Sequence, residues 1–418
     1  MKRLILLLDA LNDQPQAGLQ GRTPLEVACT PALDGIAQRG RVGVLGPPPV
    51  WGDARFEFVY LNGLGLPPRR NLPSAGPLSA LGSDLALEVD DHVYCASFVT
   101  VWEDLVADPF TVGLTGHERD ALIRDLNREL TEYGAELRSG PAGEMYLVVH
   151  DSTLHAPPTL SPYYAVGEAL INVVPQGPAS TRILDIMDCS MRFLAGHDVN
   201  RVRQDLGENP AHLLWPWGGG LPIRYPVEEE AQVPRIVIGS DSLFLGVGRY
   251  LGWETRRTEA KVGDREAGWR ALLRAMDRAL LRHDIVAVHS GALLQTSLMG
   301  TVEDRLAAIE ALDHELIRPA VQRLDKFPDH RILVLSTVGV LGEQSQLVTE
   351  AAPFAVAGSD LDGVRGYPFR ESAARASDLK PKDAAELFEF FLGMKSPIFE
   401  AYRKLLPTEW RVGEASAE

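Results

Sequence analysis

Short apolar runs alternate with longer amphipathic stretches along most of the chain. The apolar runs lie at 4–8, 235–241, 285–291, 331–337 and 353–358. Runs of this length predict strands that are buried on both faces of a sheet. The stretches at 242–252, 264–284, 301–324 and 383–394 repeat apolar residues at the spacing of one helical face. Strands that alternate with such helices predict an α/β sheet covered on both sides.

The pattern changes between residues 85 and 182. The runs at 92–102 and 144–151 are short and partly alternating, and a single amphipathic stretch follows the first of them at 117–134. This pattern of short strands around one helix predicts a small α+β insertion. We therefore expect one discontinuous α/β domain made of 1–84 and 183–412, an inserted domain at 85–182, and a disordered tail at 413–418.

Composition and charge narrow the class of protein. The chain has 418 residues, of which 45% are hydrophobic and 23% charged, and its formal net charge is −16. An acidic surface argues against nucleic acid or an anionic membrane as the main partner. The three cysteines, Cys29, Cys95 and Cys189, have no C-x-x-C spacing, which excludes a zinc ribbon and a disulfide framework and suits the cytoplasm.

The N-terminal run imitates a signal peptide but differs from one in two respects. It is too short for the apolar core of such a peptide, and it ends in Asp9. We interpret it as the first core strand. No stretch reaches the roughly 20 apolar residues of a membrane span. In an open α/β sheet, functional groups lie just beyond the carboxyl ends of the strands, which is where Asp9 is expected.

Several segments together carry a resemblance to one family. They read "LLLDALNDQP", "GRTPLEVACTPALDGIAQRG", "HDVNRVRQDLGENPAHLLWPWGGG" and "FRESAARASDLKPKDAAELFEFFLG". In sequence and order the chain resembles the cofactor-independent phosphoglycerate mutases of the archaeal type, within the alkaline phosphatase superfamily. The resemblance implies an alkaline-phosphatase-like three-layer α/β domain, with the insertion as a lid. It also implies two divalent metals (Mn, Mg or Zn), a serine nucleophile between them, and Asp9 as the first metal ligand.

The loop that should carry the nucleophile departs from the family. This chain reads "PPPVWGDARF", and alignment on Asp53 puts Gly52 at the serine position. Glycine offers no nucleophile, and no Ser, Thr or Cys replaces it in that loop.

The other metal-ligand positions depart as well. By the same resemblance, side chains that cannot serve as the family's ligands occupy five of them: Leu294, Leu298, Thr337, Val338 and Leu347. We therefore expect Asp9 to be a vestige of the metal site and expect no cofactor. The alternative role for Asp9 is a turn or capping residue that accepts backbone N–H bonds.

The lid also differs where the family holds its substrate. Cys95 and Ser97 stand at the positions of an arginine and an asparagine, and Tyr163 and Tyr164 stand near the place of an Asp-Pro-His element. Arg22, Arg69, Arg70 and Asp53 remain as candidates for binding a small ligand.

The sequence offers few signs of a different metal site or of another catalytic group. His150, Asp151 and His155 form a poor candidate for a replacement metal site. No histidine or aspartate lies at a sequence spacing from Ser290 or Ser297 that would indicate a serine nucleophile. Trp215 and Trp217 could stack on a ligand or pack the lid against the core, and His289 is expected to be a packing residue.

The sequence thus favours a pseudoenzyme that acts by binding a protein partner or a small anionic ligand, as a scaffold or regulatory subunit. One alternative is an active metal-dependent phosphoglycerate mutase or phosphatase with a rearranged site. A metal-free sensor that keeps lid closure is another. Association into a homo-oligomer stays open.

Overall fold

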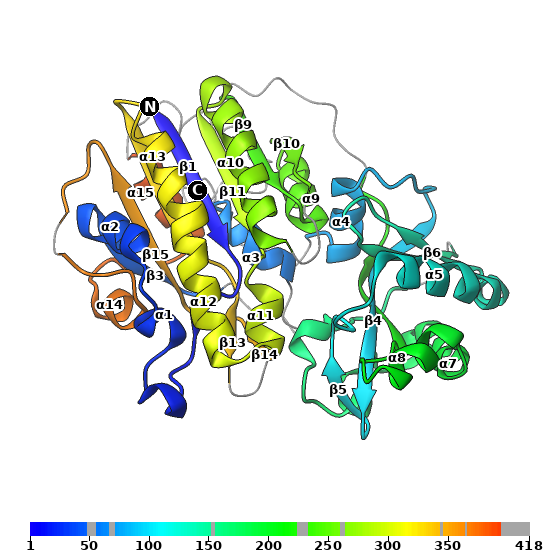
Figure 1. The fold of residues 1–418 in the computed structure, drawn as a ribbon. Coiled ribbons are helices and arrows are strands. Elements are labelled where there is room, and N and C mark those ends of the chain that lie inside the picture. The colour runs from blue at the N-terminus through cyan, green and yellow to red at the C-terminus, as the bar shows by residue number, and fades with distance from the viewer. Residues whose placement is uncertain are drawn as a thin grey trace, which may run out of the picture.

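The computed structural model describes residues 1–47, 56–66, 72–151, 155–223, 233–259, 264–342, 346–363 and 366–393. These residues form two units, each built around its own large sheet (Figure 1). Four of the predicted site residues lie outside the described residues, as does the tail at 413–418: Gly52, Asp53, Arg69 and Arg70.

The first unit contains a seven-stranded sheet in the order β10-β9-β11-β1-β12-β15-β3. Its strands are β1 (Lys2–Leu8), β3 (Arg41–Leu45), β9 (Arg235–Gly239), β10 (Glu254–Arg257), β11 (Ile285–Ser290), β12 (His330–Ser336) and β15 (Ala352–Gly358). The central strand β1 pairs in parallel with both β11 and β12, while β15 and β3 run antiparallel to their neighbours. The leucine-rich run of β1 is at most 1% exposed, as expected for a strand covered on both faces.

Helices cover both faces of this sheet, which confirms the α/β class (Figure 1). In Figure 1 the helices in front are α2 (Pro31–Arg39), α10 (Arg265–Arg282), α12 (Val302–Leu312) and α13 (Arg318–Leu324). Behind the sheet lie α3 (Phe56–Gly63) and α15 (Ala384–Leu392). The helices α9 (Ser242–Tyr250) and α14 (Glu371–Ala376) pack near the two edges of the sheet, beside β10 and β3.

The stretch predicted as one helix over 301–324 is interrupted. A π-helical turn over Asp313–Ile317 separates α12 from α13, which has a proline in its first turn. Proline has no N–H to donate, so the regular ladder of hydrogen bonds cannot continue through it. The widened turn faces the N-terminus of α2, where the buried Asp313 carboxylate accepts from the backbone N–H groups of Ala32 and Leu33 at 3.0 and 2.8 Å.

Residues 24–39 form two helices, and this contact caps the second of them. The first, α1 (Pro24–Val27), begins with a capping box between Thr23 and Glu26. Thr30 precedes α2 but makes no capping bond with its side chain, so the cap comes from Asp313, far away in sequence.

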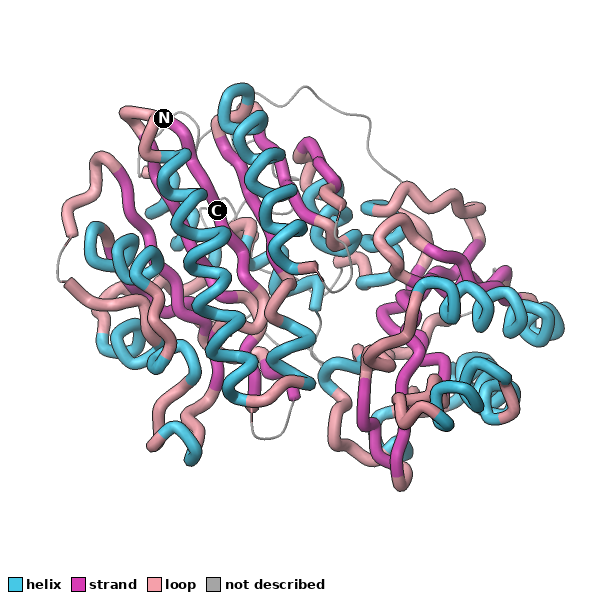
Figure 2. Tube along the Cα trace, viewed as in Figure 1, coloured by secondary structure: helices cyan, strands magenta, loops and turns pink. Residues whose placement is uncertain are grey.

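The second unit is an antiparallel sheet in the order β5-β4-β7-β6, with β8 paired to β4. Its strands are β4 (Asp91–Trp102), β5 (Leu105–Asp108), β6 (Ala135–Ser139), β7 (Met145–His150) and β8 (Leu213–Gly220). The helices α5 (Gly116–Leu130), α7 (Thr181–Ala195) and α8 (Asp198–Asp205) belong to the same unit. They lie on its outer side, away from the first unit (Figure 2).

The second unit extends beyond the predicted insertion boundary at residue 182. Strand β8 pairs with β4 over Leu213–Gly220, and α7 packs against β8. The sequence "LLWPWGGG" does not read as a strand because it contains a proline and three glycines. The proline is tolerated because β8 pairs on one side only among the described strands.

The remaining elements are short. A small sheet of β2 (Asn12–Asp13), β13 (Gly339–Leu341) and β14 (Gln346–Val348) continues from the carboxyl ends of β1 and β12. The short helices are α4 (Ala75–Gly82), α6 (Leu170–Val173) and α11 (Leu294–Met299), and 3-10 turns lie at Ala17–Leu19, Thr131–Tyr133, Pro162–Tyr164 and Pro178–Ser180. Among the described helices, none has the length and apolar character needed to cross a membrane.

Two helices of the first unit approach each other through glycines. A Cβ added at Gly246 of α9 would lie 1.7 Å from the carbonyl oxygen of Leu78 in α4. We expect Gly246→Ala to lower the free energy of unfolding by about 2–3 kcal/mol, because the two helices must separate. As a control, Gly268→Ala in α10 meets nothing within 4 Å and should stabilise the helix by about 0.5–1 kcal/mol. Chemical denaturation measures both; equal effects would contradict the packing argument.

A buried carboxyl ties α14 to β2 and to the start of α1. Glu371 is 3% exposed; it accepts from the backbone N–H of Asp13 at 3.2 Å and from the Thr23 hydroxyl at 2.8 Å. Burial raises the pKa of Glu371 from its usual 4.5 to about 7, against the effect of these hydrogen bonds.

The raised pKa means that the folded state holds the Glu371 proton more tightly than the unfolded state. The resulting stabilisation is complete below pH 4.5 and is lost as the pH rises through 7. We expect the unfolding free energy of the wild type, minus that of Glu371→Gln, to fall by about 2–3 kcal/mol between pH 4.5 and pH 8. Denaturation at both pH values measures this difference. A difference for Glu371→Gln that stays the same at both pH values would refute the assignment.

Candidate functional site

The candidate site lies at the carboxyl end of the central strand of the seven-stranded sheet. Asp9 follows β1 directly and is only 2% exposed. Its backbone N–H donates to the carbonyl of Ser290, at the end of the neighbouring strand β11, at 3.2 Å. The sheet therefore places the Asp9 carboxylate where the ends of β1, β11 and β12 meet, as the sequence predicted.

Three side chains donate hydrogen bonds to this carboxylate. Tyr60 from α3 donates its hydroxyl to Oδ2 at 3.1 Å, and His289 from β11 donates Nε2 to Oδ2 at 2.9 Å. Thr337, just after β12, donates its hydroxyl to Oδ1. A carboxylate with three such donors is well satisfied although it is buried.

The electrostatics of the pair support a charged histidine. Burial by itself lowers the pKa of His289, but the negative charge and hydrogen bond of Asp9, together with Asp241, raise the pKa above its usual value. The imidazole also packs edge-on against the Tyr60 ring, at 4.9 Å between centroids. Both partners of this 2.9 Å contact are buried, with His289 3% and Asp9 2% exposed.

Sequence reasoning missed the roles of His289 and Tyr60. His289 was expected to be a packing residue, yet it is the charged partner of Asp9. The register of the parallel strands carries a signal, because His289 lies opposite Leu7 and the strand end therefore falls beside Asp9. Tyr60 belongs to a separate helix, and only the packing of α3 behind the sheet brings it to the site.

The positions at which the resemblance places metal ligands hold mostly buried apolar groups. Leu298 and Val338 are fully buried, Leu347 is 2% exposed, and Leu294 is half-buried. In the described part of the chain, no three or more His, Cys, Asp or Glu side chains are grouped so that they could hold a metal ion. The residues described here do not fit a two-metal centre.

Other charged groups around the site are mainly acidic. Burial raises the pKa of the Cys95 thiol well above its usual value, and the nearby charges of Glu57, Asp241 and Glu144 raise it further. Burial also raises the pKa of Asp241, which caps α9 through the backbone N–H of Phe244 at 2.7 Å. The lid position that the family gives to an arginine thus faces carboxylates.

The remaining candidate residues are dispersed. Arg22 is exposed in the turn after Leu19, and its Nε donates to the Leu19 carbonyl at 3.4 Å. His150 bonds Asp91 at 2.7 Å in the second unit, far along the chain from Asp9. The Ser290 hydroxyl accepts from the indole N–H of Trp269 at 3.1 Å, and the Ser297 hydroxyl donates to the Ala10 carbonyl at 3.3 Å. Neither serine is paired with a base in these contacts.

Comparison with known proteins identifies relatives along nearly the whole chain. A family model described as 2,3-bisphosphoglycerate-independent phosphoglycerate mutase matches residues 37–200. A 2,3-bisphosphoglycerate-independent phosphoglycerate mutase 2 of Methanothermobacter thermautotrophicus is 29% identical over 395 residues, covering 94% of this chain and 97% of its own length. A probable mutase of the same kind from Geobacter sulfurreducens is 26% identical, over 94% and 100% of the two chains.

Solved structures share the fold. The PH0037 protein from Pyrococcus horikoshii superposes with a TM-score of 0.66 at 21% identity, over 96% of this chain and 97% of its own. A cofactor-independent phosphoglycerate mutase from Thermoplasma acidophilum superposes with a TM-score of 0.51 at 22% identity, over 94% and 99%. At these identities the structures support the fold, while the curated relatives carry the link to the mutases.

The contacts of Asp9 predict a large loss of stability on truncation. We expect Asp9→Ala to lower the unfolding free energy by about 3–5 kcal/mol, because it leaves a buried imidazolium and two hydroxyls without their acceptor. Thr337→Val removes one neutral donor and should cost about 1 kcal/mol. Chemical denaturation compares the two; an Asp9→Ala variant as stable as Thr337→Val would show that the charged pair contributes little.

The relatives also correct one expectation. The prediction that no cofactor is needed is wrong at the level of the family, because the matched relatives are mutases of the kind for which the resemblance implies two divalent ions. The described residues supply no ligand set for such ions. By sequence the chain is similar over nearly its whole length to 2,3-bisphosphoglycerate-independent phosphoglycerate mutases, and solved structures share its fold.

Proposed function

We propose that the chain acts on phosphoglycerate, as a 2,3-bisphosphoglycerate-independent mutase or a related phosphatase with a rearranged site. The observation that supports this is the relationship to curated mutases at 26–29% identity over about nine-tenths of the chain. Unrelated activities on the same fold are common, so the proposal rests on these sequence relatives rather than on the fold.

The proposal sets a physical requirement on Asp9. A divalent ion at this carboxylate must replace donors that now satisfy it, namely the hydroxyls of Tyr60 and Thr337 and the imidazolium of His289. Burial, with the charges of Asp241 and Asp9, holds the pKa of Tyr60 well above its usual value, so this hydroxyl keeps its proton. The rearranged site must therefore open the cluster around Asp9 and take further ligands from other parts of the chain.

The same cluster favours a second candidate function. Asp9 is hydrogen-bonded by three side chains, and Leu298, Val338 and Leu347 are packed in the core. A chain with this centre can act by binding alone, as a scaffold or regulatory subunit for a protein partner or a small anionic ligand. The carboxylates near Cys95 make the surroundings of this residue a poor place for that anion.

One assay separates the two candidates. Purified protein is incubated with 3-phosphoglycerate and Mn²⁺ or Mg²⁺, and formation of 2-phosphoglycerate and of free phosphate is measured. For the first candidate we expect turnover that a chelator abolishes and that Asp9→Asn reduces at least 100-fold. Ser297→Ala, whose hydroxyl contacts only a backbone carbonyl, is the control and should keep the activity.

The melting temperature adds an independent readout. Metal binding at Asp9 should raise the melting temperature of the wild type and leave that of Asp9→Asn unchanged. Absence of both turnover and the metal-dependent shift would refute the first candidate and leave binding as the function.

A further inference from the structure

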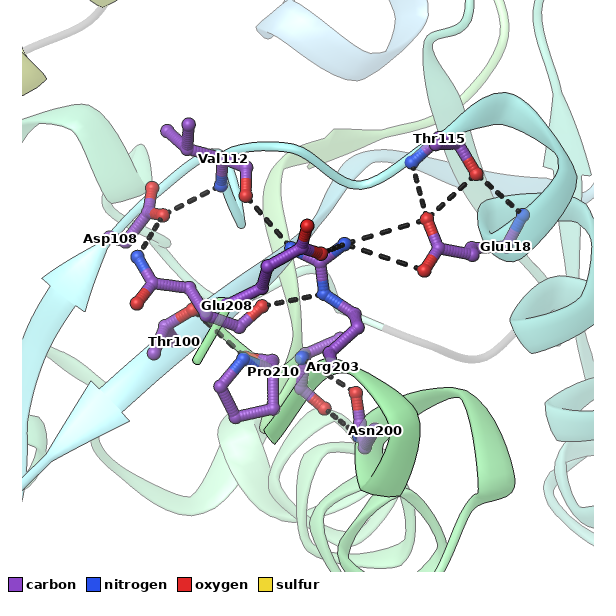
Figure 3. Close-up of polar contacts among 11 residues, drawn as sticks. Thr100, Asp108, Val112, Thr115, Glu118, Asn200, Arg203, Glu208 and Pro210 are labelled. Atoms are coloured by element: carbon purple, nitrogen blue, oxygen red, sulfur yellow. Dashed lines mark hydrogen bonds and ion pairs between the residues drawn. The ribbon is translucent and has the colours of Figure 1, made fainter. Parts of the chain in front are cut away.

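The most completely buried charge in the second unit is the guanidinium of Arg203, in α8. Arg203 is 0% exposed, and every guanidinium nitrogen has a partner (Figure 3). Nε donates to the Asn209 carbonyl at 2.7 Å, Nη2 donates to the Val112 carbonyl at 2.8 Å, and Nη1 pairs with Glu208 at 3.1 Å and Glu118 at 3.4 Å. A buried arginine that is fully paired fixes the geometry of the segments it joins.

One of those segments is the loop after β5, and a second buried charge holds it. Asp108 accepts from the backbone N–H groups of Phe110 and Val112 at 2.9 and 2.7 Å, and from the Asn209 side-chain amide at 2.8 Å. Arg203 binds the carbonyl of Val112, and Asp108 binds the N–H of the same residue. Both backbone polar groups of Val112 are therefore held by buried charged side chains (Figure 3).

The loop is strained at the residue between these contacts. Thr111 is fully buried and has φ +46°, in the left-handed region that β-branched residues rarely adopt. Its hydroxyl donates to the Phe98 carbonyl at 2.9 Å, which helps to hold it there. Strain of this kind persists only when the surrounding structure enforces it, and it is typical of functional positions.

The residue beside Thr111 is Phe110, whose ring packs on Tyr163 at 5.1 Å between centroids. Tyr163 belongs to the 3-10 turn Pro162–Tyr164 and also contacts the Trp217 ring at 6.2 Å. On its other side, Tyr163 packs against Phe56 at 6.0 Å, in the first turn of α3 in the other unit. Tyr163 therefore lies between rings of both units.

The same turn is bonded to the first unit by polar contacts. The Tyr164 hydroxyl lies 3.3 Å from that of Thr349, and the side-chain amide of Gln346 donates to the Tyr164 carbonyl at 3.1 Å. The Tyr164 ring adds a second aromatic contact with Phe56, at 6.1 Å. The turn is thus docked on the first unit by two kinds of interaction.

We propose that Arg203 and Asp108 are positioning residues that set Phe110 against Tyr163, and that this aromatic bridge to Phe56 holds the two units together. The chain of contacts runs from the buried charges to the strained loop, then to Phe110, Tyr163 and α3. The proposed role of these contacts does not depend on which candidate function is correct.

The test uses the full chain without ligand and measures the effect of each change on α3, which belongs to the first unit. Hydrogen exchange of the amides in α3 and the radius of gyration from X-ray scattering are compared for the wild type, Phe110→Ala, Asp108→Ala and Arg203→Met. We expect each variant to speed exchange in α3 at least tenfold and to enlarge the radius of gyration.

A matched control separates positioning from general stability of the second unit. Asn127→Ala removes two hydrogen bonds between α5 and β6, which lie away from the bridge. It should lower the stability of its own unit and leave exchange in α3 within twofold of the wild type. If Arg203→Met does not fold, Phe110→Ala decides, since it leaves the polar cluster intact. Unchanged exchange in α3 for Phe110→Ala, or a tenfold rise for Asn127→Ala, would overturn the proposal.

Discussion

A carboxylate buried at the end of the central strand imposes the main constraint on this protein. Asp9 cannot be left without partners where it lies, because an unpaired buried charge costs several kcal/mol. The chain meets that constraint with an imidazolium and two hydroxyls from three different elements. Strand β11, helix α3 and the turn after β12 must therefore keep their places around β1, and the core of the first unit is organised about that cluster.

The charge of Asp9 is balanced by hydrogen-bonding side chains, whereas a metal ligand is balanced by a dication. In a two-metal centre, dications offset the repulsion among several carboxylates. Here Asp9 bonds His289, whose pKa Asp241 also raises, and Leu298, Val338 and Leu347 are buried at three of the positions that the resemblance gives to metal ligands. The similarity to the mutases and the contacts of Asp9 thus point in different directions, because the first implies a metal ligand at Asp9 and the second shows its oxygens bonded to three side chains.

Aromatic rings join the two units, together with an ion pair between Arg257 of β10 and Glu144 of the second unit at 3.5 Å. Tyr163 and Tyr164 stand near the place that the resemblance gives to acidic and imidazole groups, and both pack on Phe56. Aromatic contacts of this kind contribute about 0.5–1.5 kcal/mol each beyond the area they bury. Their position near α3 links the joint between the units to the helix that supplies Tyr60 to Asp9.

The sequence by itself determined the α/β class, the strand run that ends in Asp9, and the resemblance to the mutases, because apolar periodicity and short motifs are local properties of the chain. It did not determine the partners of Asp9, since Tyr60, His289 and Thr337 are separated from it by 51 to 328 positions. Nor did it place β8 in the second sheet or Asp313 at the start of α2. Those contacts exist only after packing brings distant segments together, because a hydrogen bond or ring contact depends on distance in space and leaves no periodic trace along the chain.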